Sequence, residues 1–175
     1  CVHHLTDTHD VILNMLEECR KAGHEDRALM FCSLSKVTFP GAGVAAMAAS
    51  RRNIDYILKN MFPMIISFDK LNQVRHIRFL KDMDGLAAHM EKHRALLEPK
   101  FRAVLAILDE GLSGCGSIAR WTKPNGGYFL SLYTLGGCAK RTVQLCREAG
   151  VVLTDAGAAY PYGVDPQDSN IRIAP

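Results

Sequence analysis

The stretch FCSLSKVTFPGAGVAAMAAS, from Phe31 to Ser50, does most to decide the fold. Two short apolar runs flank a turn that contains Pro and Gly, a pattern typical of two strands joined by a loop. Because polar residues do not alternate through the runs, we expect strands that are buried on both faces. Lys36 follows the first run. Burying an ammonium group is costly unless it is paired, neutralised or used covalently, so Lys36 either caps a strand end at the surface or places an amine in a pocket.

Helical spacing dominates the residues on either side of this stretch. Apolar residues from Asp10 to Ala22 predict a helix, with Asp10 as its N-cap and Gly23 at its C-terminal end. A second predicted helix begins at Asn53 and is stopped by Pro63. An apolar stripe then continues to Leu112, which predicts a long helix that bends where Pro99 interrupts it.

The last third of the chain changes its periodicity. The segments SIARWTK and GGYFLSLYT flank the turn KPNGG and predict a β-hairpin. A helix is expected over 138–149, followed by a strand at VVLTD (151–155), a long loop and a final strand at IRIA (171–174). This order of elements predicts a second lobe of α+β character.

Composition excludes several classes of protein. The 175 residues carry 21 basic and 18 acidic side chains of interspersed sign, a net charge of +3 that indicates neither a nucleic-acid partner nor a membrane surface. The apolar runs are too short to span a bilayer. The six cysteines form no CxxC pair, so we expect buried free thiols in a reducing compartment, and hence a cytoplasmic protein.

The segment SLSK, from Ser33 to Lys36, fits more than one chemistry. An SxxK pair occurs in serine acyl-transfer enzymes of the penicillin-binding type, but SDN and KTG partners are absent and Pro40 with two glycines makes a helix at this point unfavourable. A lysine at a strand end can instead form a Schiff base with pyridoxal phosphate (PLP), whose phosphate nearby hydroxyls would hold. A strand-end turn with a solvated lysine remains the simplest alternative.

The sequence resembles a known family over most of its length. SLSKVTFPGAG is similar to the lysine segment of the fold-type I aminotransferases. Five further segments resemble one bacterial branch of that family, the aspartate aminotransferase-like group often labelled MocR-like aminotransferases: NQVRHIRFLKD, KHRALLEPKF, RWTKPNGGYFLSL, GVVLTDAGAAYPYG and DPQDSNIRIAP. Their joint order is far more specific than any single segment.

The resemblance implies a role for four residues. Lys36 corresponds to the lysine that binds PLP as an aldimine and then moves a proton between the substrate α-carbon and the cofactor. Ser33 and Ser35 correspond to hydroxyls on the phosphate side. Arg172 corresponds to the arginine that binds the substrate α-carboxylate, a task suited to its planar fork of donors. The implied reaction transfers an amino group between an amino acid, with aspartate as a candidate, and a 2-oxo acid, in a homodimer and without a metal.

Two departures affect the implied cofactor site. Many relatives carry a phosphate-binding arginine shortly after the lysine, where this chain has Ala42 and Gly43. The family's aspartate at the pyridine nitrogen and its tyrosine at the ring oxygen precede the segment that corresponds to Cys1. We therefore expect a C-terminal fragment of a longer protein, whose phosphate contacts come from the serines, backbone N–H groups or residues outside this sequence.

The expected fold class is α/β, in three parts. Residues 1–70 would form the end of the large PLP-binding domain, 71–112 the long kinked connecting helices, and 113–175 a small α+β domain. Two other functions stay open: the PLP-binding effector domain of a MocR-type transcription regulator, and a catalytically incomplete fragment without cofactor.

Other residues invite a functional interpretation with less support. His89 and His93 lie four apart on a predicted helix, and His3, His4 and His9 cluster near the N-terminus, but neither group has the spacing of a metal motif, so solvated positions are favoured. Four residues could line the mouth of the substrate site or pack in turns and core: Gly127, Tyr128, Tyr160 and Tyr162.

Overall fold

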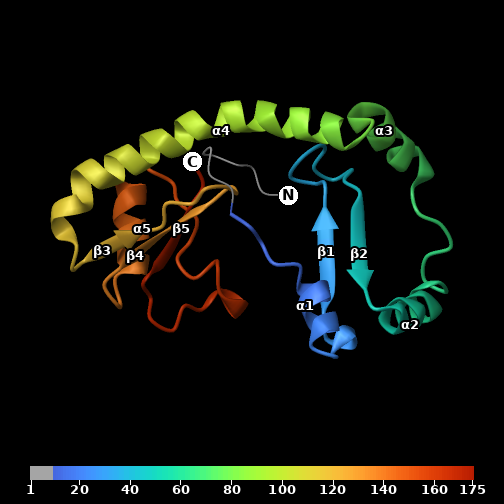
Figure 1. Ribbon diagram of the computed structural model, residues 1–175. Helices are drawn as coiled ribbons and strands as arrows, with labels where there is room; N and C mark the ends of the chain where they lie inside the picture. The colour runs from blue at the N-terminus through green and yellow to red at the C-terminus, as the bar shows by residue number, and fades with distance from the viewer. Residues whose placement is uncertain (1–9) are drawn as a thin grey trace. The chain divides into compact units, whose positions relative to one another are not determined.

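The computed structural model of the chain describes residues 10–175. These residues form two compact units, Asp10–Glu91 and Lys92–Pro175, and the boundary between them falls inside helix α4 (Met83–Leu112). Each unit contains its own antiparallel sheet (Figure 1). Cys1 and the three histidines His3, His4 and His9 lie outside the described residues, and the three-part division at residues 70 and 112 remains a prediction.

The first unit combines a two-stranded sheet with helices. Its elements are α1 (Met15–Lys21), the 3₁₀ turn η1 (Glu25–Arg27), β1 (Leu29–Ser33), β2 (Ala45–Ala49), α2 (Arg51–Met61), α3 (Lys70–Leu80) and the first part of α4. The strands β1 and β2 pair from Leu29 opposite Ala49 to Ser33 opposite Ala45. The predicted order of strand, loop and strand is therefore confirmed.

Helix α1 begins four residues later than predicted. Asn14, rather than Asp10, is its N-cap, because the Asn14 side chain accepts hydrogen bonds from the backbone N–H groups of Leu16 and Glu17. The predicted end is confirmed. Gly23 has φ +72°, a left-handed conformation that favours glycine after a helix.

The prediction that β1 and β2 are buried on both faces is wrong. In β2 three residues are exposed and two are half-buried. All five residues of β1 are exposed, Phe31 by 73% of its surface. Among the described residues β1 pairs with β2 alone, and so large apolar side chains remain uncovered on this small sheet. Exposed apolar surface of this extent indicates a face that another part of a protein covers.

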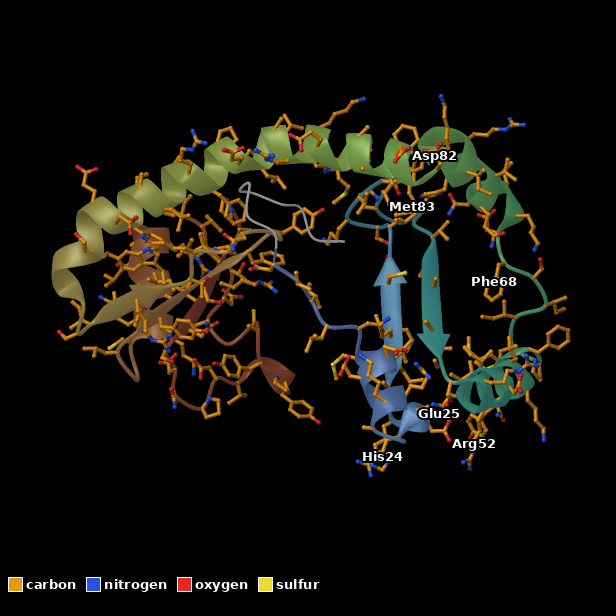
Figure 2. The ribbon with its side chains drawn as sticks, viewed as in Figure 1. His24, Glu25, Arg52, Phe68, Asp82 and Met83 are labelled. Carbon is orange, nitrogen blue, oxygen red and sulfur yellow. The ribbon has the colours of Figure 1, made fainter. Side chains whose placement is uncertain are left out.

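Polar contacts join the start of α2 to η1. Asp26 accepts a hydrogen bond from the Ser50 hydroxyl at 2.5 Å and pairs with Arg52 at 3.3 Å. Ser50 also caps α2 by accepting from the Asn53 backbone N–H. In Figure 2 the labels Glu25 and Arg52 mark these adjoining ends, and Asp82 with Met83 marks the junction of α3 and α4. There the Asp82 carboxylate accepts from the Gly85 backbone N–H at 2.8 Å.

The second unit confirms the predicted hairpin and final strand. Strand β3 (Ala119–Trp121) pairs with β4 (Leu130–Thr134), and β4 pairs with β5 (Asn170–Ile173). The predicted helix is α5 (Ala139–Glu148), and two 3₁₀ turns, η2 (Ser113–Cys115) and η3 (Pro161–Gly163), complete the unit. Helix α4 runs for 30 residues with Pro99 inside it.

One face of this sheet carries the core of the second unit. Leu132 and Ile171 pack with Ala139 and Val143 of α5, while Leu130 packs with Phe101 of α4. Because side chains alternate along a strand, Ser131 and Arg172, which are paired across β4 and β5, belong to the opposite face. The core therefore directs Arg172 away from the helices that cover the sheet.

Two further predictions are wrong in this structure. No strand forms at 151–155, because the Val151 N–H donates to the Cys146 carbonyl at 2.8 Å and closes the end of α5, which leaves Val152 80% exposed. The described cysteines, 19, 32, 115, 138 and 146, are free as predicted, but they are half-buried or exposed instead of buried. No helix among residues 10–175 is both long and apolar enough to cross a membrane.

The Asp165 carboxylate organises the loop that leads into β5. It accepts hydrogen bonds from the backbone N–H groups of Ser169 and Asn170, each at 2.8 Å, and of Gln167 at 3.0 Å. These bonds, that of Ser169 foremost, hold the pKa of Asp165 below its usual value because they stabilise the charged form. The ionised carboxylate thus stabilises the loop that positions β5.

We expect acid to weaken this loop. A lowered folded-state pKa gives stability that is present above the unfolded value of about 3.9 and is lost as pH falls through the folded value. Asp165→Asn should therefore lower the urea midpoint at pH 7, and the difference from wild type should shrink below about pH 4. Equal midpoints at pH 7, or a difference that persists unchanged in acid, would contradict this role.

Candidate functional site

Ser33 and Ser35 form a compact pair of hydroxyls at the end of β1. Their Oγ atoms lie 2.8 Å apart, and the Ser35 backbone N–H donates to Ser33 Oγ at 3.1 Å. Gly43, on the returning segment of the loop, lies so close that a Cβ there would overlap the Ser35 hydroxyl. The two serines and the glycine therefore form a small, closely packed group of hydroxyls and backbone, called the cradle below.

Lys36 lies in a single helical turn directly after this cradle. The carbonyl oxygen of Leu34 accepts from the backbone N–H of Val37 at 2.9 Å and of Thr38 at 2.8 Å. Val37 is 1% exposed, so its side chain anchors the turn in the first unit, whereas Lys36 is exposed. The turn thus carries the lysine at a fixed place, three residues beyond the end of the strand.

Side chains from α3 and α4 fasten the loop that contains Lys36. The Thr38 hydroxyl lies 2.8 Å from Nε2 of His76, and the Asn72 side-chain amide donates to the Ala42 carbonyl at 2.6 Å. His89 donates from Nε2 to the Val37 carbonyl at 2.7 Å. None of the sequence patterns described above predicted this cluster.

A sequence signal for the cluster does exist. In NQVRHIRFL, Asn72 and His76 are four residues apart and so lie on the same face of α3. Both are buried, with 9% and 4% of their surface exposed. His89, considered above as a metal ligand, contacts the Lys36 turn instead, and among residues 10–175 no group of three or more His, Cys, Asp or Glu side chains is placed to hold a metal.

Arg172 lies in the second unit, on β5. Its guanidinium carbon is 4.6 Å from the centroid of the Phe129 ring, a cation–π contact. Its Nε atom is buried and, within the described part of the chain, has no hydrogen-bond partner. A buried donor without a partner is costly, so this atom is suited to an external acceptor such as a carboxylate.

The four residues considered for the substrate mouth differ in their surroundings. Gly127 has φ +91° and Tyr162 has φ +57° with its side chain fully exposed, so both serve turns in this unit. Tyr160 is half-buried. Burial raises the pKa of the Tyr128 phenol, which therefore stays protonated at neutral pH.

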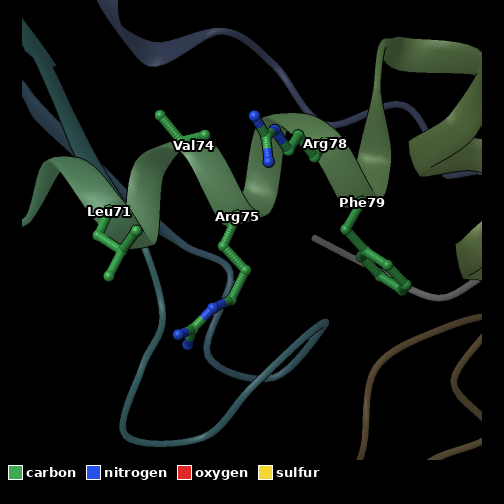
Figure 3. A pocket seen from close by; sticks show the side chains of 5 residues that line it. All are labelled: Leu71, Val74, Arg75, Arg78 and Phe79. Carbon is green, nitrogen blue, oxygen red and sulfur yellow. The ribbon is translucent and has the colours of Figure 1, made fainter.

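Three hollows in the first unit lie near the cradle or on α3. An apolar hollow of about 540 Å³ extends between the sheet and 57–68, and Ser33 and Cys32 are among the residues that line it. A second hollow, of about 400 Å³, lies along one side of α3 and is lined by Leu71, Val74, Arg75, Arg78 and Phe79 (Figure 3). A third, of about 470 Å³, has Leu34, Val44 and His76 among its lining residues. Lys36 lines none of the three.

Comparisons with known proteins agree with the resemblance seen in the sequence. A family model described as aspartate amino-transferase matches residues 1–175. A protein of Mycolicibacterium smegmatis named "Putative aminotransferase" is 49% identical over 174 residues, and an aspartate aminotransferase of Corynebacterium glutamicum is 41% identical. Each alignment covers 99% of this chain, but the chain spans only 40% of the length of these relatives.

Solved structures show the same fold. A crystal structure of an aspartate transaminase from Corynebacterium glutamicum, 41% identical, superposes with a TM-score of 0.92 over 99% of this chain and 41% of its own. The α-aminoadipate aminotransferase LysN of Thermus thermophilus, solved with N-(5'-phosphopyridoxyl)-L-leucine, gives a TM-score of 0.75 at 22% identity and covers 99% of this chain and 43% of its own. The predicted α/β class, with a long helix followed by a small sheet, is confirmed.

The cradle leads to a prediction for Gly43→Ala. The added Cβ would meet Ser35 Oγ, and the Ser35 Cα and N atoms lie 3.0 Å from it, so the turn must shift. We expect a loss of about 1–3 kcal/mol in the free energy of unfolding, measured with urea, as for other overpacked sites. Gly111→Ala, in α4 with no atom within 4 Å, is the matched control and should not destabilise the chain. Similar unfolding of wild type and Gly43→Ala would show that the cradle is not tightly packed.

Proposed function

Because the chain belongs to the aspartate aminotransferase family, we propose that the protein transfers an amino group between an amino acid and a 2-oxo acid, with pyridoxal 5'-phosphate bound at Lys36. The observation that carries this proposal is the position of Lys36, in a fixed turn directly after the paired Ser33 and Ser35 hydroxyls. A homodimer and a cytoplasmic location belong to the same proposal.

The residues of the cradle fit the cofactor. Ser33, Ser35 and the backbone beside Gly43 offer short donors and close approach to a phosphate, although Ala42 and Gly43 replace the arginine of many relatives. When bound, pyridoxal phosphate supplies an electron sink that stabilises negative charge at the substrate α-carbon. The Lys36 amine would hold the cofactor aldehyde and would then accept and return the α-carbon proton at its Nζ atom.

Arg172 would bind the substrate. Its unpartnered, buried Nε and its planar fork suit a bidentate pair with the α-carboxylate, and the Phe129 ring would keep the guanidinium in place. The name of the Corynebacterium glutamicum relative suggests aspartate as a donor. A second carboxylate-binding group, which aspartate would require, is not assigned to any residue of this chain.

Amino transfer and its dependence on Arg172 test the proposal. The full-length protein with pyridoxal phosphate should move the labelled amino nitrogen of aspartate or another amino acid to 2-oxoglutarate, detected by mass spectrometry. In Arg172→Gln we expect the KM for the amino acid to rise at least about thirtyfold, because loss of one partner of a charge pair costs about 2 kcal/mol or more. Arg172→Lys keeps the charge but loses the planar fork of donors, so its KM for the amino acid should lie between those of wild type and Arg172→Gln.

The affinity for pyridoxal phosphate is the internal control. It should be the same in wild type and Arg172→Gln, because Arg172 would contact the substrate only. The proposal fails if the protein transfers no amino group from any of the twenty common amino acids. Cofactor binding without turnover would favour the effector-domain alternative. An unchanged KM in Arg172→Gln would remove Arg172 from the substrate site while leaving the activity in place.

A further inference from the structure

His76 is a buried titratable residue that the proposed chemistry does not use. Only 4% of its surface is exposed, and both ring nitrogens have a neighbour at hydrogen-bond distance. Nδ1 lies 2.9 Å from the Asn72 carbonyl oxygen and Nε2 lies 2.8 Å from the Thr38 hydroxyl. The Phe39 ring packs edge-on against the imidazole at 6.0 Å between centroids. The ring is therefore held by contacts on three sides.

The hydrogen-bond partners determine the tautomer of His76. A carbonyl oxygen can only accept, so Nδ1 carries a hydrogen that it donates to Asn72. In the neutral ring Nε2 is then an acceptor, and it receives the single hydrogen of the Thr38 hydroxyl. The Thr38 hydroxyl also lies 3.1 Å from the Leu34 carbonyl, which therefore competes for the same hydrogen. Thr38 thus links α3 to the turn that carries Lys36.

The backbone of that turn is held at both of its ends, by Val44 at Leu34 and by α3 at Thr38. Leu34, whose carbonyl closes the turn, is also bonded through its N–H to the Val44 carbonyl at 2.9 Å. Thr38, at the other end, is held by His76. One helical turn earlier on α3, Asn72 holds the Ala42 carbonyl at 2.6 Å, on the returning side of the loop. Helix α3 therefore fastens the loop at two points that follow the lysine, Thr38 and Ala42.

We propose that His76 and Thr38, supported by Asn72, are positioning residues that fix the Leu34–Thr38 turn and thereby the place of Lys36. The inference deepens the proposed function, because the value of a fixed turn lies in presenting the lysine amine to the cofactor and the substrate α-carbon. Neither residue needs to touch cofactor or substrate. Their effect reaches the lysine through the backbone hydrogen bonds to the Leu34 carbonyl.

Amide hydrogen exchange tests the turn without cofactor. In the full-length apo protein, Thr38→Val keeps the shape of the side chain but leaves His76 Nε2 without its donor. We expect the backbone amides of residues 37 and 38 to exchange at least about tenfold faster in this variant than in wild type. Thr38→Ser retains the hydroxyl, and His76→Gln offers an amide oxygen as acceptor near the position of Nε2. Each of these single variants should therefore keep most of the wild-type protection of the two amides against exchange. Unchanged exchange of both amides in Thr38→Val would overturn the inference, whether or not the protein binds cofactor.

Steady-state kinetics separate positioning from general stability. Thr38→Val should lower kcat at least about tenfold while the KM for the amino acid, assigned to Arg172, changes by less than about threefold. Thr142→Val is the matched control, because the Thr142 hydroxyl also donates to a carbonyl four residues earlier, that of Cys138, at 2.8 Å in α5. The control should keep the wild-type kcat.

The possible outcomes distinguish this inference from the proposed function. Faster exchange in Thr38→Val together with an inactive wild type would support the role of His76 and Thr38 in fixing the turn. It would also refute the proposed aminotransferase activity. An active wild type whose kcat is unaffected by Thr38→Val, or equally lowered by Thr142→Val, would refute a positioning role for Thr38. A lowered kcat that Thr38→Ser restores would support both.

Discussion

The carbonyl oxygen of Leu34 is the point on which the candidate site depends. It accepts the backbone N–H groups of Val37 and Thr38 and lies 3.1 Å from the Thr38 hydroxyl. Because of these contacts, the chain passes directly from the strand, which ends at Ser33, into one helical turn from Leu34 to Thr38. Ser33, at the end of the strand, pairs with Ser35, which lies in the turn next to Lys36. A lysine on an unconstrained loop would lose considerable conformational entropy each time it engaged a cofactor, whereas here much of that ordering precedes binding.

The helices beside the small sheet, more than the sheet itself, hold this turn in place. Within the described residues β1 pairs with β2 alone, and its side chains are exposed, so the sheet gives the loop little packing. The constraint comes from α3 and α4 instead, through Asn72, His76 and His89. In the second unit the core covers one face of the sheet and so determines that Arg172 lies on the other face.

Local patterns predicted the elements well and their surroundings poorly. The glycine after α1, the hairpin around KPNGG and the apolar runs on either side of Lys36 act over a few residues, and the structure confirms them. The burial of β1 failed because an apolar run shows only that a strand can be covered, not that the cover is present. The strand at 151–155 failed because the Val151 N–H closes α5. The spacing of Asn72 and His76 places both on one face of α3, but the contact of His76 with Thr38, 38 residues away, required the structure.

The proposed function requires that pyridoxal phosphate attaches to Lys36. Reduction of the cofactor-loaded, full-length protein with borohydride, followed by proteolysis and mass spectrometry, locates the attached group directly. We expect the phosphopyridoxyl mass on the peptide that contains Lys36 and its absence in Lys36→Ala, while Lys70→Ala, a change at the start of α3, leaves the labelling of Lys36 intact. Labelling at another lysine, or no lysine-dependent labelling at all, would show that Lys36 does not hold the cofactor.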